Sequence, residues 1–326
     1  MTLHGPVLPP GGTVGVPAPG WTVGAPEEVE RATRWWESRG YRVKLTGRVL
    51  EGRQGYGAAD ARERGVELTE MFEDPEVDAI QCFEAGYGAP AMLEHLDLDA
   101  VREHPKAFMG FSDITTLHLY LGAVTGLVTF YGPLFVLMGR RGRAFTADRA
   151  LAALTSVRPI GEISRGPDDV DVLTWGSGRA TGRLVGGTLW PIIQSIGTAW
   201  QPDLTGAILL FEDIAKAPYL VDEQLSQLRH AGMLEGLAGV VVGEMAACDW
   251  RTVPESWPKL MSLEDVLDEH LGDLGVPAIF GLPIGHGKHL ATVPLGVRAT
   301  VDADRGTLTI DESALAVPGE KRGGTA

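Results

Sequence analysis

The stretch that decides the fold is residues 106–127, KAFMGFSDITTLHLYLGAVTGL. Its first part, 106–111, is predicted as a short buried strand, and 115–127 is predicted as a helix with an apolar stripe. Ser112 therefore stands on a sharp strand-to-helix turn, with its hydroxyl exposed beside the first free N–H groups of the helix. Those N–H groups can stabilise an oxyanion, so the turn offers two of the three parts of an acyl-transfer site. The missing part is a base with an orienting carboxylate.

A serine at such a turn also has a simpler interpretation. Serine is a preferred helix N-cap, and most serines at the start of a helix only cap it. The pattern also departs from the G-x-S-x-G turn of serine hydrolases, because Ile114 stands where the second glycine would be. Local sequence therefore leaves both the nucleophile and the cap open, and residues outside this segment have to decide.

Strands and helices are predicted to alternate before this turn. Strands are expected at 12–17, 41–45 and 77–83, and helices at 27–39, at 58–72 and from about residue 91. This βαβ alternation predicts an α/β fold with a parallel, doubly wound sheet. Ligands of such sheets bind beyond the carboxyl ends of the strands, and both Ser112 and the loop 84–90 lie at such ends.

The second half of the chain has a different texture, with more predicted β structure. Strands are expected at 207–211 and 239–242, helices at 189–196 and 219–230, and a hairpin at 297–310. The predicted boundaries are 1–157 for an N-terminal α/β domain, 158–180 for a polar linker, 181–316 for a C-terminal domain and 317–326 for a flexible tail. A chain of 326 residues is long enough for two such domains.

Composition limits the partners. A net charge of −15 argues against nucleic acid or an anionic membrane surface. No apolar run is long enough to span a bilayer, and the start of the chain lacks the charged and apolar regions of a signal peptide. Cys82 and Cys248 lie far apart and form no metal or redox spacing. A reducing, cytoplasmic setting fits these features, and neither nucleic acid nor a membrane is expected as a partner.

The second half offers both a carboxylate and a base. Glu212 and Asp213 close a predicted strand, and only one of them can face a given pocket because strand side chains alternate. Adjacent acids of this kind are more often solvated. In the run 285–289, GHGKH, His286 lies between two glycines and is free of neighbouring side chains. His286 and His289 could instead bind a metal, but no further Cys/His cluster supports that, so we expect neither metal nor cofactor.

The loop 86–91, GYGAPA, raises a competing interpretation. It matches G-x-G-x-x-A after a strand and before a helix, and Asp113 follows the next strand, where a ribose-binding acid would stand. This is the best case for a non-enzymatic dinucleotide binder. The match does not lie on the first strand, and Pro90 stiffens the loop. The same glycines could instead allow close approach of an acyl group to the backbone.

Taken together, these segments resemble the LD-carboxypeptidase (murein tetrapeptide carboxypeptidase) family of serine peptidases, which includes the microcin-immunity branch. The resemblance rests on the runs 79–88, 109–115, 186–189, 201–204, 210–213, 217–219, 227–228, 236–239, 285–286 and 294–296. Their order and spacing follow the family over about residues 11–312, which makes the set far more specific than any single motif.

The resemblance implies a Ser-His-Glu triad. Ser112 would be the nucleophile, His286 the general base and Glu212 the residue that orients the imidazole, while the backbone N–H groups of Gly86 and Asp113 would form the oxyanion hole. The site would lie between a flavodoxin-like N-terminal domain with a parallel sheet and a β-rich, swivelling-type α/β C-terminal domain. The family also tends to form homodimers.

The sequence departs from the family at two places. The usual Arg-Gly-Gly-Tyr-Gly begins here with Glu84, and the usual Gly-Gly-Asn ends with Thr188. We expect Glu84, Tyr87, Thr188 and Trp190 to contact substrate. The leading function is cleavage of an L,D-peptide bond in a cytoplasmic murein tetrapeptide, with release of D-alanine during peptidoglycan recycling. The alternative keeps the triad but acts on a peptidyl-nucleotide or another amide, because an anion beside the pocket opposes a carboxylate.

Overall fold

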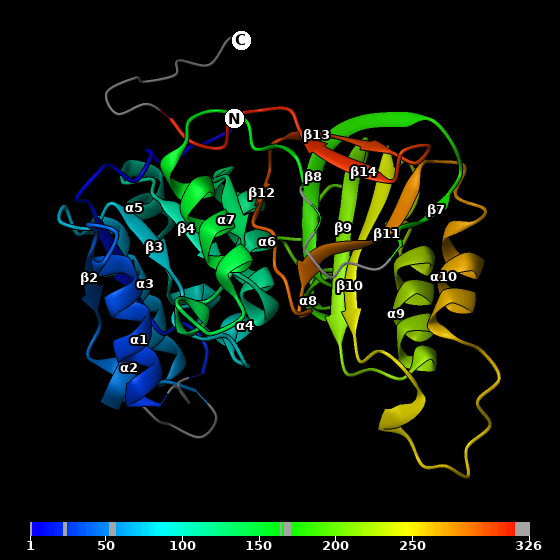
Figure 1. Cartoon of the computed structure of the whole chain (residues 1–326), viewed down its shortest axis with the longest axis horizontal. Coiled ribbons are helices and arrows are strands. Elements are labelled where there is room, and N and C mark those ends of the chain that lie inside the picture. The colour runs from blue at the N-terminus through cyan, green and yellow to red at the C-terminus, as the bar shows by residue number, and fades with distance from the viewer. Residues whose placement is uncertain (1, 22–24, 52–56, 164, 166–170, 317–326) are drawn as a thin grey trace.

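The computed structural model describes residues 2–21, 25–51, 57–163, 165 and 171–316, and the tail expected at 317–326 lies outside them. Two lobes lie side by side, each built on its own sheet (Figure 1). The lobes share a hydrophobic core that continues from the first sheet to buried residues of the second. Along the described part of the chain, no helix is both long and apolar enough to cross a bilayer.

The first sheet has the strand order β12-β5-β4-β3-β1-β2. Its strands are β1 (Thr13–Val16), β2 (Arg42–Leu45), β3 (Ala79–Gln81), β4 (Ala107–Gly110), β5 (Thr129–Tyr131) and β12 (Val293–Leu295). β1 to β5 are parallel in the order 2-1-3-4-5, which is the flavodoxin-like arrangement expected. β1, β3, β4 and β5 are buried throughout, because helices cover both faces of a parallel sheet.

Helices alternate with these strands, as the sequence predicted. They are α1 (Pro26–Glu37), α2 (Arg48–Glu51), α3 (Ala61–Glu73), α4 (Ala89–Met92), α5 (Leu98–Glu103), α6 (Thr115–Thr125) and α7 (Ala144–Thr155). Short 3-10 turns add η1 (Leu93–His95), η2 (Ser112–Ile114) and η3 (Phe135–Leu137). The single helix expected from about residue 91 is instead interrupted, because the Asp97 side chain accepts the N–H groups of Asp99 and Ala100 and starts α5 anew.

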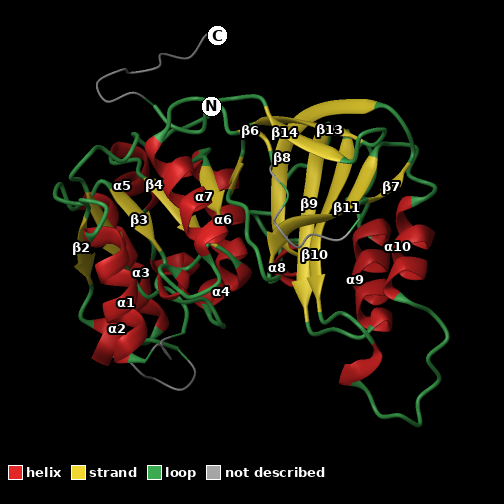
Figure 2. Ribbon diagram, in the orientation of Figure 1, coloured by secondary structure: helices red, strands yellow, loops and turns green. Residues whose placement is uncertain are grey.

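The second sheet has the order β6-β14-β13-β8-β9-β10-β11-β7. Its strands are β6 (Gly161–Glu162), β7 (Leu173–Trp175), β8 (Arg179–Thr188), β9 (Ala207–Ile214), β10 (Gly239–Ala246), β11 (Ala278–Gly285), β13 (Arg298–Asp302) and β14 (Thr307–Ile310). β8 to β11 are parallel and the outer strands antiparallel (Figure 2). This second, mixed sheet confirms the fold class, and the hairpin expected at 297–310 is β13–β14.

Helices cover the second sheet mainly on its outer side. α9 (Pro218–His230) and α10 (Leu263–Leu271) lie side by side there (Figure 1), over a second apolar cluster. α8 (Leu189–Gln194) follows β8 and packs against α6 of the first lobe, and η4 (Trp250–Thr252) follows β10. α6 also packs directly on β8, so the helix that follows Ser112 forms part of the contact between the lobes.

Three further segments differ from the sequence prediction. β9 continues to Ile214 instead of ending at Phe211, because β8 and β10 pair with it on both sides as far as Glu212 and Ile214. The stretch expected as a linker, 158–180, contains β6 and β7, which form the two edges of the second sheet. β12, from the part expected in the C-terminal domain, pairs antiparallel with β5 and protects that edge of the first sheet.

Candidate active site

Ser112 occupies the turn between β4 and α6 in a strained backbone conformation. Its φ is 64°, in the left-handed region that residues other than glycine seldom adopt. The N-cap positions of η2 and α6, Phe111 and Ile114, make no side-chain capping bond, and Ser112 itself is not a cap. Such strain is often stored where a side chain must be presented to a reaction. The Ser112 hydroxyl is therefore not used to cap its own helix.

The partner of that hydroxyl comes from the other lobe. His286 Nε2 lies 3.0 Å from Ser112 Oγ, and His286 Nδ1 lies 2.7 Å from Oε2 of Glu212. A carboxylate only accepts, so Nδ1 carries the proton and Nε2 presents its lone pair to the serine hydroxyl. The Phe111 ring lies 4.8 Å from the imidazole, centroid to centroid, and screens it from water. The three side chains are thus arranged to move a proton from Ser112 to His286.

Glu212 is fully buried and accepts four hydrogen bonds. Oε2 accepts the backbone N–H of His286 at 3.1 Å as well as Nδ1, and Oε1 accepts the hydroxyls of Thr188 at 2.7 Å and Tyr131 at 2.5 Å. Four donors fill the acceptor capacity of an ionised carboxylate. Gly285 makes room for this arrangement, because a Cβ there would lie 2.3 Å from Glu212 Oε2 and its φ of 117° suits only glycine.

The hydroxyls of Thr188 and Tyr131 both donate to Oε1 of Glu212, and neither role was predicted from the sequence. Thr188, expected to contact substrate, is only 6% exposed and spends its hydroxyl on Glu212. Tyr131 ends β5, and burial next to the Glu212 charge raises its pKa well above the usual value, so it remains a donor. The available signal for Tyr131 was its place at the end of an apolar run, 127–131, followed by Gly132 and Pro133.

The backbone N–H groups of Gly86 and Asp113, which were expected to form the oxyanion hole, lie on neighbouring loops that are connected by a hydrogen bond. Asp113 directly follows Ser112, and its carboxylate accepts the N–H of Ala89 at 2.9 Å, which attaches the loop after β3 to the serine turn. Arg64 of α3 donates to the carbonyls of Gly88, Ala59 and Pro19. Gly86, in the left-handed region, lies in this fastened loop. Burial raises the pKa of Asp113 to about 6, opposed by the Ala89 N–H and the Arg64 charge.

The remaining expected substrate contacts lie on both sides of the site. Tyr87 is 63% exposed and its ring lies 6.2 Å from that of Trp21, centroid to centroid, in a tilted arrangement, and Trp190 at the start of α8 is 48% exposed. The Lys216 ammonium lies 5.9 Å from the Trp190 ring and 3.5 Å from Asp213. Tyr87 and Trp190 therefore both reach the surface of the protein.

Glu84, the other departure from the family, is half-buried in the loop three residues after β3. Burial raises the pKa of its carboxyl to about 7; its neighbour Glu28 adds to this increase, and the Ala85 N–H and Arg140 oppose it. Glu84 is therefore a desolvated acid rather than a solvated one.

The two lobes are joined around the triad. After β11 the chain passes through His286 and enters the first sheet as β12, so the imidazole loop is held by a strand of each sheet. On the opposite side, the N–H of Thr188 donates to Thr115 Oγ1 at 2.9 Å. A Cβ at Gly187 would lie 2.6 Å from that oxygen, so glycine permits the close approach. These contacts fix Ser112 relative to His286.

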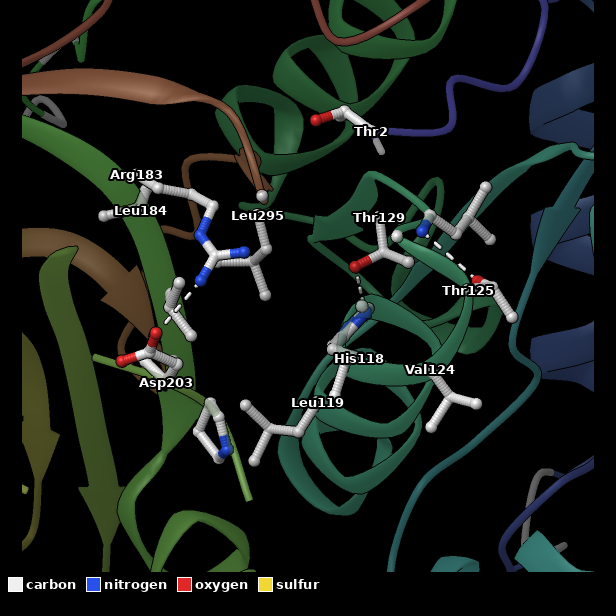
Figure 3. A pocket seen from close by; sticks show the side chains of 18 of the residues that line it. Thr2, His118, Leu119, Val124, Thr125, Thr129, Arg183, Leu184, Asp203 and Leu295 are labelled. Atoms are coloured by element: carbon white, nitrogen blue, oxygen red, sulfur yellow. Dashed lines mark hydrogen bonds between the residues drawn. The ribbon is translucent and has the colours of Figure 1, made fainter. Parts of the chain in front are cut away.

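A cavity of about 570 Å³ lies behind the site, between α6 and β8 (Figure 3). None of the described residues that line it belongs to the triad. His118 is one of them, and nothing in its sequence context suggested a role for it. Its ring bonds to Thr129 Oγ1 and to the carbonyl of Gly110, both at 2.9 Å, and burial lowers its pKa to about 4. A neutral His118 thus supports the strand end that carries Ser112.

The competing interpretations can be placed in the same structure. His289 is buried, with its ring 5.5 Å from Phe145, instead of standing beside His286 as a second ligand. Across the described residues no group of three or more His, Cys, Asp or Glu side chains could hold a metal ion. Asp113, which a dinucleotide site would need for a ribose hydroxyl, accepts the Ala89 N–H. The geometry therefore favours nucleophilic chemistry at Ser112.

The chain is similar to known proteins along most of its length. Residues 14–132 match the LD-carboxypeptidase N-terminal domain model, and 181–301 match the C-terminal domain model. The chain is 35% identical over 317 residues to the "Probable murein peptide carboxypeptidase" of Bacillus subtilis, covering 92% of each. It is 26% identical over 328 residues to the Microcin C7 self-immunity protein MccF of Escherichia coli, covering 90% of this chain and 91% of that protein. The structure of MccF in complex with glutamyl sulfamoyl guanosine superimposes with a TM-score of 0.86 at 24% identity, covering 96% of this chain and 100% of that chain.

Proposed function

The chain belongs to the LD-carboxypeptidase family, and from that premise we propose that it is a serine carboxypeptidase with a Ser112-His286-Glu212 triad. The observation that carries the proposal is the continuous hydrogen-bonded series from Ser112 Oγ through the His286 ring to Glu212, with distances of 3.0 and 2.7 Å. Its substrate would be an L,D-peptide bond in a cytoplasmic peptidoglycan fragment, and a terminal D-alanine would be the first product.

In the first half of the reaction, Ser112 Oγ attacks the carbonyl carbon of the scissile bond while His286 Nε2 takes the hydroxyl proton. The new positive charge on the imidazole is stabilised by the Glu212 carboxylate, which is already bonded to Nδ1. When the C–N bond breaks, Nε2 returns the proton to the leaving amine. An acyl-serine ester remains, and free D-alanine leaves.

In the second half, a water molecule takes the place of the leaving amine. Nε2 removes one proton from the water, the resulting hydroxide adds to the acyl carbon, and the proton returns to Ser112 Oγ as the ester bond breaks. The backbone N–H groups of Gly86 and Asp113 would hold the oxyanion in both halves. The Asp113 carboxylate and Arg64 keep the two loops that carry these groups in register.

The cellular setting and assembly belong to the same proposal. The described cysteines, Cys82 and Cys248, are both free and buried, which suits a reducing cytoplasm. The named Bacillus subtilis relative supports a murein peptide as the substrate class and peptidoglycan recycling as the process. A homodimer remains the expected assembly, and no metal or other cofactor has a part in the proposed reaction.

A second candidate substrate is favoured by particular residues. Glu84 places an acid at the site, and Trp190 offers an exposed aromatic face with the Lys216 ammonium 5.9 Å away. An aromatic face with a nearby cation suits a nucleobase and its phosphate. The same triad would then release an aminoacyl group from a peptidyl-nucleotide, as fits the similarity to a microcin-immunity protein.

One experiment separates these possibilities. The purified protein and its Ser112→Ala variant are incubated with a panel of muropeptides, peptide amides and aminoacyl nucleotides, and the products are identified by mass spectrometry. The leading proposal is supported if the parent releases D-alanine from a tetrapeptide and Ser112→Ala does not. Cleavage restricted to aminoacyl nucleotides supports the second substrate.

A serine-reactive fluorophosphonate serves as the chemical control. The label should attach to Ser112 in the parent and fail in Ser112→Ala, and a chelator should change neither labelling nor turnover. Loss of activity with EDTA and its recovery with zinc would contradict the serine mechanism.

A further inference from the structure

A short arginine-rich loop, residues 139–143, runs from η3 to α7 along one side of the site. Its last residue reaches the other lobe, because Arg143 Nη1 donates to the carbonyl of Gly287 at 2.8 Å. Gly287 directly follows His286. The loop is therefore attached at this end to the segment that carries the imidazole.

The other end of the loop faces the oxyanion side. Val136 of η3 donates its N–H to the carbonyl of Phe83, directly before Glu84, and the N–H of Arg143 donates to the carbonyl of Arg140 at 3.1 Å. The Arg140 charge also opposes the burial that raises the pKa of Glu84. Glu84 precedes Gly86 by two residues. Arg140 thus lies between the loop after β3 and the His286 loop, on the rim that connects the two.

The positive charge of Arg140 is less compensated by neighbouring groups than that of Arg143. Arg143 is half-buried, bonded to a carbonyl and influenced by Glu244, whereas Arg140 is exposed. Within the described part of the chain, the Arg140 guanidinium forms no ion pair with a carboxylate, although its charge acts on the Glu84 carboxyl. An exposed cation of this kind, in a protein with a net charge of −15, is available to an anionic ligand.

The direction of the reaction says which part of a substrate meets this rim. His286 Nε2 must reach the leaving amine to protonate it, so the leaving group lies on the imidazole side of Ser112. In a terminal amino acid the carboxylate is one carbon away from that amine. It must therefore also lie on the His286 side, where Arg143 fastens the loop to Gly287.

We propose that Arg140 binds the terminal carboxylate of the substrate and that Arg143 holds the loop in place for this contact. The inference rests on the proposed peptidase function and names the residue that makes the enzyme selective for free-acid termini. A guanidinium suits the task because its planar fork matches a carboxylate with two hydrogen bonds. Glu84, beside Arg140, weakens this attraction without replacing it.

The test compares a tetrapeptide ending in D-alanine with the same peptide ending in D-alaninamide. In Arg140→Gln, kcat/KM for the free acid should fall by roughly ten- to a hundredfold, mainly through KM, because the contact exists before and during the reaction. The amide should change by less than about twofold. Arg141→Gln removes the neighbouring exposed arginine of the same loop and should leave both substrates unchanged.

A binding measurement separates failure of this inference from failure of the proposed function. The Kd of the free-acid peptide is measured by calorimetry on Ser112→Ala and on Ser112→Ala combined with Arg140→Gln. If the parent cleaves neither peptide but the double variant still binds at least about tenfold more weakly, the peptidase proposal fails and the role of Arg140 stands. If the parent cleaves the free acid and Arg140→Gln leaves the acid-to-amide ratio within twofold, or if Kd does not change, Arg140 does not bind the carboxylate.

Discussion

The two sheets present their parts of the site by opposite means. At the end of β4, Ser112 is held by backbone strain, with a φ of 64° and no capping bond of its own helix. Near the end of β9, Glu212 is held by four hydrogen bonds to its fully buried carboxylate. His286 connects the two, on a loop anchored in both sheets.

The difference teaches how work is divided between the lobes. A nucleophile must be accessible, so it cannot be fixed by burying its oxygen among donors, and a constrained backbone positions it instead. An orienting carboxylate never leaves its place, so it can be buried and fully bonded before the substrate arrives. Changes at the first end should therefore remove reactivity with little effect on folding, whereas changes at the second should affect both.

The largest effect should come from the nucleophile itself. Ser112→Ala should lower kcat by on the order of a millionfold, because no other group can form the acyl intermediate. His286→Ala should be nearly as damaging. Circular dichroism and melting temperature should match the parent for Ser112→Ala. Retained turnover above about a tenth of the parent would contradict the serine mechanism.

The buried carboxylate should come next. In Glu212→Gln the amide cannot accept all four hydrogen bonds, and its NH₂ group would face donors and favour the wrong imidazole tautomer. We expect kcat to fall by about ten-thousandfold, the usual scale for such a change in a triad. Unlike Ser112→Ala, this variant should also melt at a lower temperature. Equal melting temperatures of Ser112→Ala and Glu212→Gln would contradict the proposed difference between the strand ends that carry Ser112 and Glu212.

A substitution at Thr188 tests how much its hydrogen bond to Glu212 contributes to catalysis. Thr188→Val keeps the shape of the side chain but leaves Oε1 with Tyr131 as its only side-chain donor. A lost hydrogen bond to a buried charge costs about 1–3 kcal/mol, so kcat should fall by roughly ten- to a hundredfold. Thr181→Val is the matched control, because that hydroxyl bonds Thr300 far along the same strand, β8. If both variants behave alike in steady-state kinetics, Thr188 acts only as a packing residue.

Glu84 predicts a pH effect on folding. Its pKa is raised by burial from 4.5 to about 7 in the folded protein, so the folded state binds more protons than the unfolded state in that interval. Stability is therefore present below about pH 4.5 and declines as the pH rises towards 7. Glu84→Gln should remove this decline, raising the free energy of unfolding at pH 8 relative to pH 5 by about 1–3 kcal/mol compared with the parent.

Urea unfolding at the two pH values measures this effect. Glu103→Gln, at an exposed acid of the same lobe, provides the control and should leave the difference between pH 5 and pH 8 as in the parent. The same difference in Glu84→Gln and in the parent would show that Glu84 is solvated in solution.

The smallest effect concerns the strain at Ser112. Alanine at a left-handed position carries the same backbone cost as serine, whereas glycine does not. Ser112→Gly should therefore unfold with a free energy about 1 kcal/mol higher than Ser112→Ala, although both are inactive. Chemical denaturation of the two variants measures this directly. A lower stability of the glycine variant would mean that the turn is not strained.

Much of this arrangement could be predicted without coordinates, because it depends on local patterns. Alternating apolar runs and helical segments predicted the parallel sheet, and the resemblance of the short motifs to a family supplied Ser112, Glu212 and His286 as candidates. The hairpin β13–β14 followed from alternation around a turn. Each of these signals lies within a few residues, or in the order of motifs along the chain.

The surroundings of the triad carboxylate could not be predicted in the same way. Tyr131 and Glu212 are 81 positions apart, and Thr188 and Glu212 are 24 apart, so nothing local indicated that their side chains meet. Thr188 was expected to face substrate because it departs from a family motif, yet the pairing of β8 with β9 turns it towards Glu212. The extension of β9 to Ile214 depended in the same way on its two neighbours.

By itself, the sequence determined the alternating strands and helices that lead up to Ser112 and the residue types that stand at strand ends, since these follow from side-chain periodicity and turn chemistry. The strands β6, β7 and β12 were not among the predicted elements. Only the tertiary structure decided that β12 leaves the second lobe to pair with β5, and that the loop from His286 is thereby held across Ser112. The physical reason is that pairing of distant strands and burial of a charge are satisfied jointly by the whole fold, and no local segment carries that information.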